Sequence, residues 1–166
     1  VMGLAPYGVP KYKDLILKEL MDLKEDGSFR LRMKYFNYAT GLSMTNDKFS
    51  KLFGQKRRDP KKDLLTQFHM DIAASVQSAI EEIILKLTSS IAKETNISNL
   101  CLAGGVALNC VANGKILKNK IFKEIWIQPA AGDAGGSLGA ALAFWHKELK
   151  KNRKPSSNLD DMNGSY

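Results

Sequence analysis

Two short apolar runs, each followed at once by a glycine-rich turn, constrain the fold of this chain more than any other feature. The first run is 99–103 (NLCLA), which leads into Gly104-Gly105. The second is 125–128 (IWIQ), which leads into the loop 129–136 (PAAGDAGG). Each turn is followed by a helical stretch. A strand, a glycine turn and a helix, repeated once, predict a βαβα unit whose two strands are parallel.

The two helices of this unit are expected at 106–117 and 137–149. Apolar residues in the second are spaced four, three and four apart, which predicts one buried face. These residues are Leu138, Leu142, Trp145 and Leu149.

The longest expected helix covers 61–94. Its apolar residues are spaced four, four, three, four and four apart, which is typical of one buried stripe; they are Ile72, Val76, Ile80, Ile83, Leu87 and Ile91. Polar residues lie on its other faces, among them Gln77, Ser78, Glu81, Glu82 and Lys86. A helix of about 30 residues would be about 45 Å long, so a break is expected near 68–71. Because His69 and Asp71 are two residues apart, they point to different faces, which argues against a catalytic dyad.

The first part of the chain carries weaker signals. Residues 1–10 read as an ordered loop, and a helix is expected from Pro10 to a stop at Asp26-Gly27. Alternation of bases with apolar side chains predicts a half-exposed strand within 29–38. A short helix is expected at 47–53.

The net charge of +8 comes from 25 Lys and Arg against 17 Asp and Glu, in a chain of 166 residues. Runs 56–62 and 147–154 each carry five bases and one acid, so together they account for the whole excess. This favours two solvated surface runs over a nucleic-acid-binding face. The alternative is a phosphate-binding or interdomain patch, for which Arg57 and Arg58 are the better candidates because guanidinium groups bind oxyanions bidentately.

Cys101 and Cys110 match neither a zinc site nor a disulfide framework, so two buried thiols and a reducing, cytoplasmic location are expected. No apolar run is long enough for a membrane span, and no signal peptide pattern is visible at the first residue.

Both glycine turns follow strands, where ligands bind in open parallel sheets. Gly104 and Gly105 would let the backbone approach a flat ring or a phosphate. Asn109 offers a donor and an acceptor to a ribose or a base, or else makes a helix-terminal hydrogen bond. Together the turns make a case for a nucleotide.

In the second turn, Asp133 lies between Gly132 and Ala134, just before Gly135-Gly136. Asp133 is either a helix cap or a ligand of a divalent cation next to phosphate-binding amides. No pattern typical of a nucleophile, a zinc protease or a Walker loop is present, so no catalytic residue is assigned.

Four segments carry a family resemblance: MGLAPYG at 2–8, DIAASVQ at 71–77, LAGGVALNCVANGKI at 102–116 and PAAGDAGGSLGAAL at 129–142. In this order they resemble the NodU/CmcH carbamoyltransferases. The DIAAS and GGVALN segments are also similar to the tRNA threonylcarbamoyl-transferase family.

The resemblance implies an α/β fold, the second lobe of an actin/sugar-kinase/heat-shock-ATPase-like fold, with a mixed sheet flanked by helices. It implies a lobe at 1–146 and a linker at 147–166 toward a YrdC-like domain, with Val1 marking a cut through a longer protein. The other lobe would carry two histidine metal ligands.

The implied function is transfer of a carbamoyl group from carbamoyl-adenylate, made from carbamoyl phosphate and ATP, to a hydroxyl of a small-molecule acceptor. By the resemblance, Asp133 would be one ligand of a divalent metal, iron(II). The residues expected to hold the adenylate are Gly104, Gly105, Asn109, Gly132, Gly135 and Gly136. The chain alone is expected to be inactive and to expose the apolar surface that meets the other lobe. Alternatives are a tRNA-modifying relative and a basic nucleic-acid-binding module.

Overall fold

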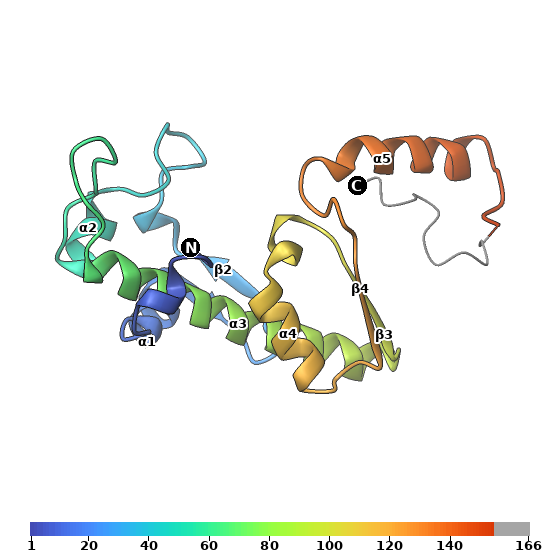
Figure 1. The fold of residues 1–166 in the computed structure, drawn as a ribbon, viewed down its shortest axis with the longest axis horizontal. Coiled ribbons are helices and arrows are strands. Elements are labelled where there is room, and N and C mark those ends of the chain that lie inside the picture. The colour runs from blue at the N-terminus through green and yellow to red at the C-terminus, as the bar shows by residue number, and fades with distance from the viewer. Residues whose placement is uncertain (155–166) are drawn as a thin grey trace. The chain divides into compact units, whose positions relative to one another are not determined.

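A computed structural model of the protein describes residues 1–154, in two compact units (Figure 1). The first unit is Val1–Asn96, and the second begins at Ile97. Both combine helices with a two-stranded sheet, so the expected mixture of helices and strands is confirmed. The expected single mixed sheet is wrong for the described residues, because the strands form two separate pairs. The predicted linker lies outside the described residues from 155 onward.

The first unit starts with a 3-10 turn and contains a small antiparallel hairpin. Its elements are the 3-10 turn Ala5–Tyr7, α1 (Lys13–Leu15) with a π-helical turn at Ile16–Leu20, β1 (Met21–Leu23), β2 (Phe29–Leu31), a 3-10 turn at Met33–Tyr35, α2 (Asp47–Phe53) and α3 (Gln67–Thr95). The expected helix at 47–53 is confirmed.

The helix expected to reach Asp26 ends at Leu20 instead. Met21 pairs with Leu31, and Leu23 pairs with Phe29. The Asp26-Gly27 signal therefore belongs to a hairpin turn. Strand pairing with a partner several residues later in the chain overrode the helical spacing of this segment. The expected strand in 29–38 is confirmed only for its first three residues.

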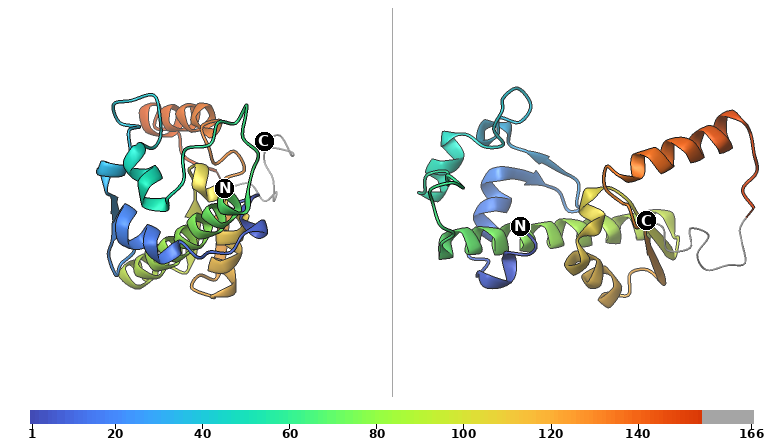
Figure 2. Two further views of the ribbon diagram at one scale, coloured as in Figure 1. Left: turned by 90° about the vertical axis from the view of Figure 1, so that its left-hand side faces the viewer. Right: turned by 45° about the horizontal axis from the view of Figure 1, so that its top comes forward.

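Helix α3 is 29 residues long and continuous (Figure 2). It begins at Gln67, six residues later than expected, and the expected break at 68–71 is wrong because the helix starts there. Asn96, in the left-handed conformation with φ 53°, ends it. Among residues 1–154, no helix is both long enough and apolar enough to cross a membrane.

The core of the first unit lies between α3, the hairpin and α2. Its buried residues are Ile16, Leu20, Met21, Tyr35, Phe53, Ala79 and Ile83, and much of the predicted apolar stripe packs against them. Gln77 and Glu81 are buried rather than on a free face. The Gln77 amide donates a hydrogen bond to the Glu81 carboxylate (2.8 Å), which lowers the cost of burying both groups. Ile91, at the end of the stripe, is exposed.

The second unit is the predicted βαβα unit. Its elements are β3 (Asn99–Leu102), a 3-10 turn at Gly105–Leu108, α4 (Cys110–Lys118), β4 (Glu124–Ile127), α5 (Gly135–Ala143) and a π-helical turn at Phe144–Glu148. Strands β3 and β4 are parallel and in register from Asn99 opposite Glu124 to Leu102 opposite Ile127. Ala112 and Ile116 of α4 are buried.

Burial in the second unit differs from expectation in two places. No residue of α5 is buried, and Trp145, in the turn that continues it, is 49% exposed. Cys101 and Cys110 are both exposed, not buried. Cys101 lies opposite Trp126, so the two form one uncovered face of the strand pair. Hydrophobic spacing predicts a face that prefers burial, but a partner surface must be present to bury it.

Candidate functional site

The two glycine-rich turns lie next to each other at the carboxyl edge of the β3–β4 pair. The Gly104 amide donates to the Ala131 carbonyl (2.7 Å), and the Gln128 amide donates to the Leu102 carbonyl (3.2 Å). A Cβ on Gly132 would lie 4.0 Å from the Gly105 Cα. Parallel pairing is the cause, because it brings both strand ends to one edge. The structure thus brings together residues from the two turns that the sequence could only place separately.

At two of these positions, backbone conformation or close packing leaves no room for a side chain. Gly104 has φ 99°, a conformation that side chains disfavour. A Cβ on Gly135 would lie 2.2 Å from the Ala130 carbonyl oxygen, which is a clash.

Two other glycines have no such requirement. A Cβ on Gly105 or on Gly136 would meet no atom of the described chain within 4 Å, and neither residue has a positive φ. Packing within residues 1–154 therefore does not explain why these positions lack a side chain.

Asn109 is the N-cap of α4. Its side-chain oxygen accepts a hydrogen bond from the Ala112 amide (3.2 Å), so the helix-terminal role that the sequence left open is present. Asn109 is half-buried and four residues beyond Gly105, at the start of the helix that follows the first turn.

Asp133 is exposed and does not cap α5. The N-cap residue of α5 is Ala134, and no side chain caps that helix end. A protein metal site for iron needs several ligands. Within residues 1–154, no three His, Cys, Asp or Glu side chains gather in one place, so the described residues do not form a complete metal site. The resemblance implies one ligand, Asp133, from this chain and two histidines from another lobe, and the exposed Asp133 carboxylate is compatible with that single role.

Gln128, at the end of β4, is a polar residue that the sequence analysis did not single out. Its side-chain oxygen is buried, and within the described part of the chain it accepts no hydrogen bond. The same oxygen would lie 3.5 Å from a Cβ on Gly135, so it adjoins the second glycine turn. The only available signal was a polar residue directly after an apolar strand.

A second polar cluster joins the start of the chain to α3, and the sequence analysis did not predict these contacts. Asp71 is only 1% exposed; its carboxylate accepts hydrogen bonds from the Val9 amide (2.9 Å) and the Gln67 side chain (2.9 Å), and it pairs with Lys11. One helical turn later, Ser75 accepts from the Tyr12 amide (3.0 Å).

Electrostatics reinforces this cluster. The Lys11 ammonium group, followed by the Val9 amide and the Gln67 side chain, lowers the pKa of Asp71 from 3.8 to about 2. The signal in the sequence was two polar residues four apart in DIAAS, among alanines small enough for close approach. These contacts attach residues 9–12, which directly follow the resemblance segment 2–8, to the segment 71–77, and they give Asp71 and Ser75 a structural role.

His69 does not pair with Asp71. Its ring nitrogen Nδ1 accepts a hydrogen bond from the Thr66 amide (3.0 Å), which stabilises the start of α3. This hydrogen bond gives His69 a structural role at the start of the helix.

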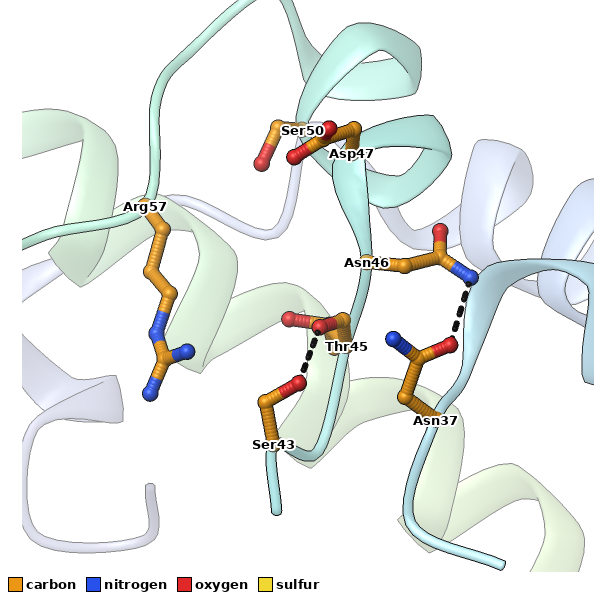
Figure 3. A pocket seen from close by; sticks show the side chains of 7 residues that line it. All are labelled: Asn37, Ser43, Thr45, Asn46, Asp47, Ser50 and Arg57. Carbon is orange, nitrogen blue, oxygen red and sulfur yellow. Dashed lines mark hydrogen bonds between the residues drawn. The ribbon is translucent and has the colours of Figure 1, made fainter. Parts of the chain in front are cut away.

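The two arginines of the basic run 56–62 have different surroundings. Arg58 donates to the Asp63 carbonyl (2.8 Å) and so holds its own loop. Arg57 instead lines a polar pocket of about 210 Å³ beside α2 (Figure 3).

Comparison with known proteins gives a family match over most of the chain. The family model described as carbamoyltransferase N-terminus matches residues 1–142. An uncharacterized protein of Synechocystis sp. is 61% identical over the whole chain, which covers 27% of that protein. Nodulation protein NolO of Bradyrhizobium diazoefficiens is 41% identical over 86% of the chain, which covers 24% of that protein.

A shorter part of the chain is similar to a threonylcarbamoyltransferase that acts on tRNA. The tRNA N6-adenosine threonylcarbamoyltransferase of Thermosipho africanus is 50% identical over 54% of the chain, which covers 28% of that protein. The chain spans about a quarter of the length of these curated relatives.

Proposed function

The chain belongs to the carbamoyltransferase N-terminus family, and on this premise we propose that it is part of an enzyme that transfers a carbamoyl group from carbamoyl-adenylate to a hydroxyl of a small-molecule acceptor. The carbamoyl-adenylate would be made from carbamoyl phosphate and ATP. The chain's own role is to bind the adenosine part, and the lobe is of the ATPase-like type.

The observation that carries this proposal is the pair of adjacent glycine turns. Gly105 and Gly136 lack side chains although packing within the described residues would allow them. A flat base or a phosphate could approach the backbone at such positions, because ligands of parallel sheets bind beyond the carboxyl ends of the strands and helix N-termini favour anions. Gly104, Gly132 and Gly135 shape the two turns around this surface.

Polar groups at the same edge would orient the ligand. Asn109 lies at the start of α4, and the buried Gln128 oxygen is an acceptor beside the second turn. A ribose hydroxyl or an exocyclic amine would satisfy such an acceptor.

Asp133 would give one ligand to a divalent metal, iron(II), whose other ligands lie outside this chain. When bound, such a metal would polarise the transferred carbonyl group. This chain's contribution is confined to holding the adenylate and offering one carboxylate.

The test uses the full-length enzyme that contains this chain, with Gly105→Val compared with Gly114→Val. Both glycines lie in the second unit, and a Cβ at either position meets no atom within 4 Å, so both variants should fold. Gly105→Val should weaken adenylate binding by at least about a hundredfold, since an overlapping side chain excludes the ligand. Gly114→Val should bind within a factor of about three. Calorimetry that finds equal affinity for both variants would refute the adenosine site.

Transfer to a tRNA adenosine is the second candidate, favoured by the similarity to the threonylcarbamoyltransferase. A third, a basic nucleic-acid-binding module, rests on the net charge of +8. The same enzyme, offered hydroxyl compounds and a tRNA transcript, separates them. We expect carbamoylation of a hydroxyl compound and no tRNA binding at moderate salt, whereas tRNA affinity falling steeply with salt would favour the nucleic-acid alternatives.

A further inference from the structure

A polar pocket in the first unit is independent of the proposed adenylate site, which lies in the second unit. It has a volume of about 210 Å³, and every residue that lines it is polar or charged: Asn37, Ser43, Thr45, Asn46, Asp47, Ser50 and Arg57 (Figure 3). Drug-sized ligands occupy sites of roughly 300–1,000 Å³, so this pocket suits a smaller molecule. The absence of apolar side chains from its lining favours a ligand that is polar throughout.

The walls of the pocket are held by hydrogen bonds. Phe36 and Thr45 form an antiparallel bridge that closes the loop between them. The Asn46 side chain donates to the Lys34 carbonyl (3.0 Å) and to the Asn37 side-chain oxygen (3.2 Å). A preformed wall reduces the ordering cost that a ligand has to overcome.

Two backbone amides at the start of α2 are already used in hydrogen bonds within the chain. The Asn46 side-chain oxygen already accepts hydrogen bonds from the Lys48 amide (3.0 Å) and the Phe49 amide (3.4 Å). The proposed recognition therefore rests on the other side chains that line the pocket.

Two opposite charges line the pocket without neutralising each other. Within residues 1–154, neither Asp47 nor Arg57 has an ion-pair partner or a side-chain hydrogen bond. In Figure 3 the guanidinium group of Arg57 and the carboxylate of Asp47 lie on different sides of the pocket. The Ser50 side chain lies beside Asp47, and those of Ser43 and Thr45 lie lower, on the side of the guanidinium group.

This charge arrangement selects a class of ligand. A simple anion would pair with Arg57 but be repelled by Asp47, and a simple cation would meet the opposite conflict. A molecule with both charges satisfies both groups, since guanidinium groups bind carboxylates bidentately and carboxylates accept hydrogen bonds from ammonium groups. We propose that this pocket binds a small zwitterion, with its carboxylate at Arg57 and its ammonium group at Asp47.

The test is a titration of the 166-residue chain, followed by the backbone amide signals of residues 37–57 in NMR spectra. The probes are glycine, β-alanine and γ-aminobutyrate, which separate the two charges by increasing distances. Acetate, methylamine, glucose and phosphate are the comparison compounds. We expect one amino acid of the series to bind with a Kd below about 10 mM, and the four comparison compounds to bind at least about tenfold more weakly.

Variants locate the binding. Arg57→Gln and Asp47→Asn should each weaken binding of the amino acid by about tenfold or more, because each removes one charged partner. Lys56→Gln and Glu25→Gln, which remove the same charges from exposed positions outside the pocket, should leave it unchanged. Circular dichroism spectra establish that all four variants are folded. The proposal is overturned if no amino acid of the series binds, if glucose or phosphate binds as well, or if the two pocket variants bind like the two controls.

Discussion

At the residue level, one buried side chain attaches the start of the chain to α3. Asp71 accepts hydrogen bonds from an amide and a side chain and pairs with Lys11, although it lies on a helix whose spacing suggests only an apolar stripe. The carboxylate can be buried because all of these partners are donors. If one is removed, a charged group is left without compensation, which is costly in a buried site.

The lowered pKa of Asp71 predicts a specific dependence of stability on pH. Because the folded-state pKa is about 2 and the ordinary value is 3.8, the ionised form stabilises the fold. This contribution is complete above about pH 4 and is lost as the pH falls toward 2. Urea unfolding at a series of pH values should therefore show a steeper loss of stability in this window for the wild type than for Asp71→Asn.

A control at an exposed position is Asp26→Asn; among residues 1–154, the Asp26 carboxylate accepts hydrogen bonds from the amide and the hydroxyl of nearby Ser28. This variant should be about as stable as the wild type at pH 7, whereas Asp71→Asn should be clearly less stable. Parallel pH profiles for the wild type and Asp71→Asn would contradict the assigned role.

At the scale of elements, the first dozen residues and α3 stabilise each other. The segment around Gly8 lies against the start of α3, and a Cβ on Gly8 would come within 2.0 Å of the Met70 carbonyl oxygen. That oxygen belongs to the helix backbone, so it cannot move aside as a side chain could. The small residues of both segments therefore have a packing function.

Gly8→Ala should destabilise the protein by about 1–3 kcal/mol through overpacking. Gly3→Ala, in the same segment, places its Cβ where no atom lies within 4 Å, and it should change stability by less than about 0.5 kcal/mol. Thermal unfolding of the two variants is the measurement. Equal unfolding midpoints would mean that the segment does not dock closely on α3.

In the molecule as a whole, the second unit exposes apolar side chains in two places of the described chain. Trp126 is exposed on the β3–β4 pair, and Leu142, Phe144 and Trp145 are exposed on α5 and the turn that continues it. Exposed apolar surface of this kind promotes association.

The 166-residue chain should therefore self-associate as its concentration rises. Sedimentation velocity should show this, and Leu142→Lys with Phe144→Lys should shift the chain toward monomer. Leu42→Lys, which adds the same charge at an exposed apolar position of the first unit, should not. A wild-type chain that stays monomeric at high concentration would contradict the prediction.

Local patterns predicted part of this structure well. The βαβα unit, the helix at 47–53 and most of α3 follow from spacing and turn residues, which depend on neighbours in the chain. The same patterns did not predict where the first helical segment ends, because Met21–Leu23 forms a strand by pairing with residues 29–31. Burial in α5 did not follow either, because it depends on a surface that only tertiary structure can provide.

Motifs and spacing along the chain were enough to identify the family resemblance, the order of strands, turns and helices in the second unit, and the residues of both glycine turns. Three features became visible only after folding: the two turns adjoin each other, Asp71 anchors the start of the chain, and Arg57 and Asp47 line one pocket. Propensity and periodicity act between neighbouring residues, whereas the approach of Gly104 to Ala131 or of Val9 to Asp71 depends on how distant segments pack.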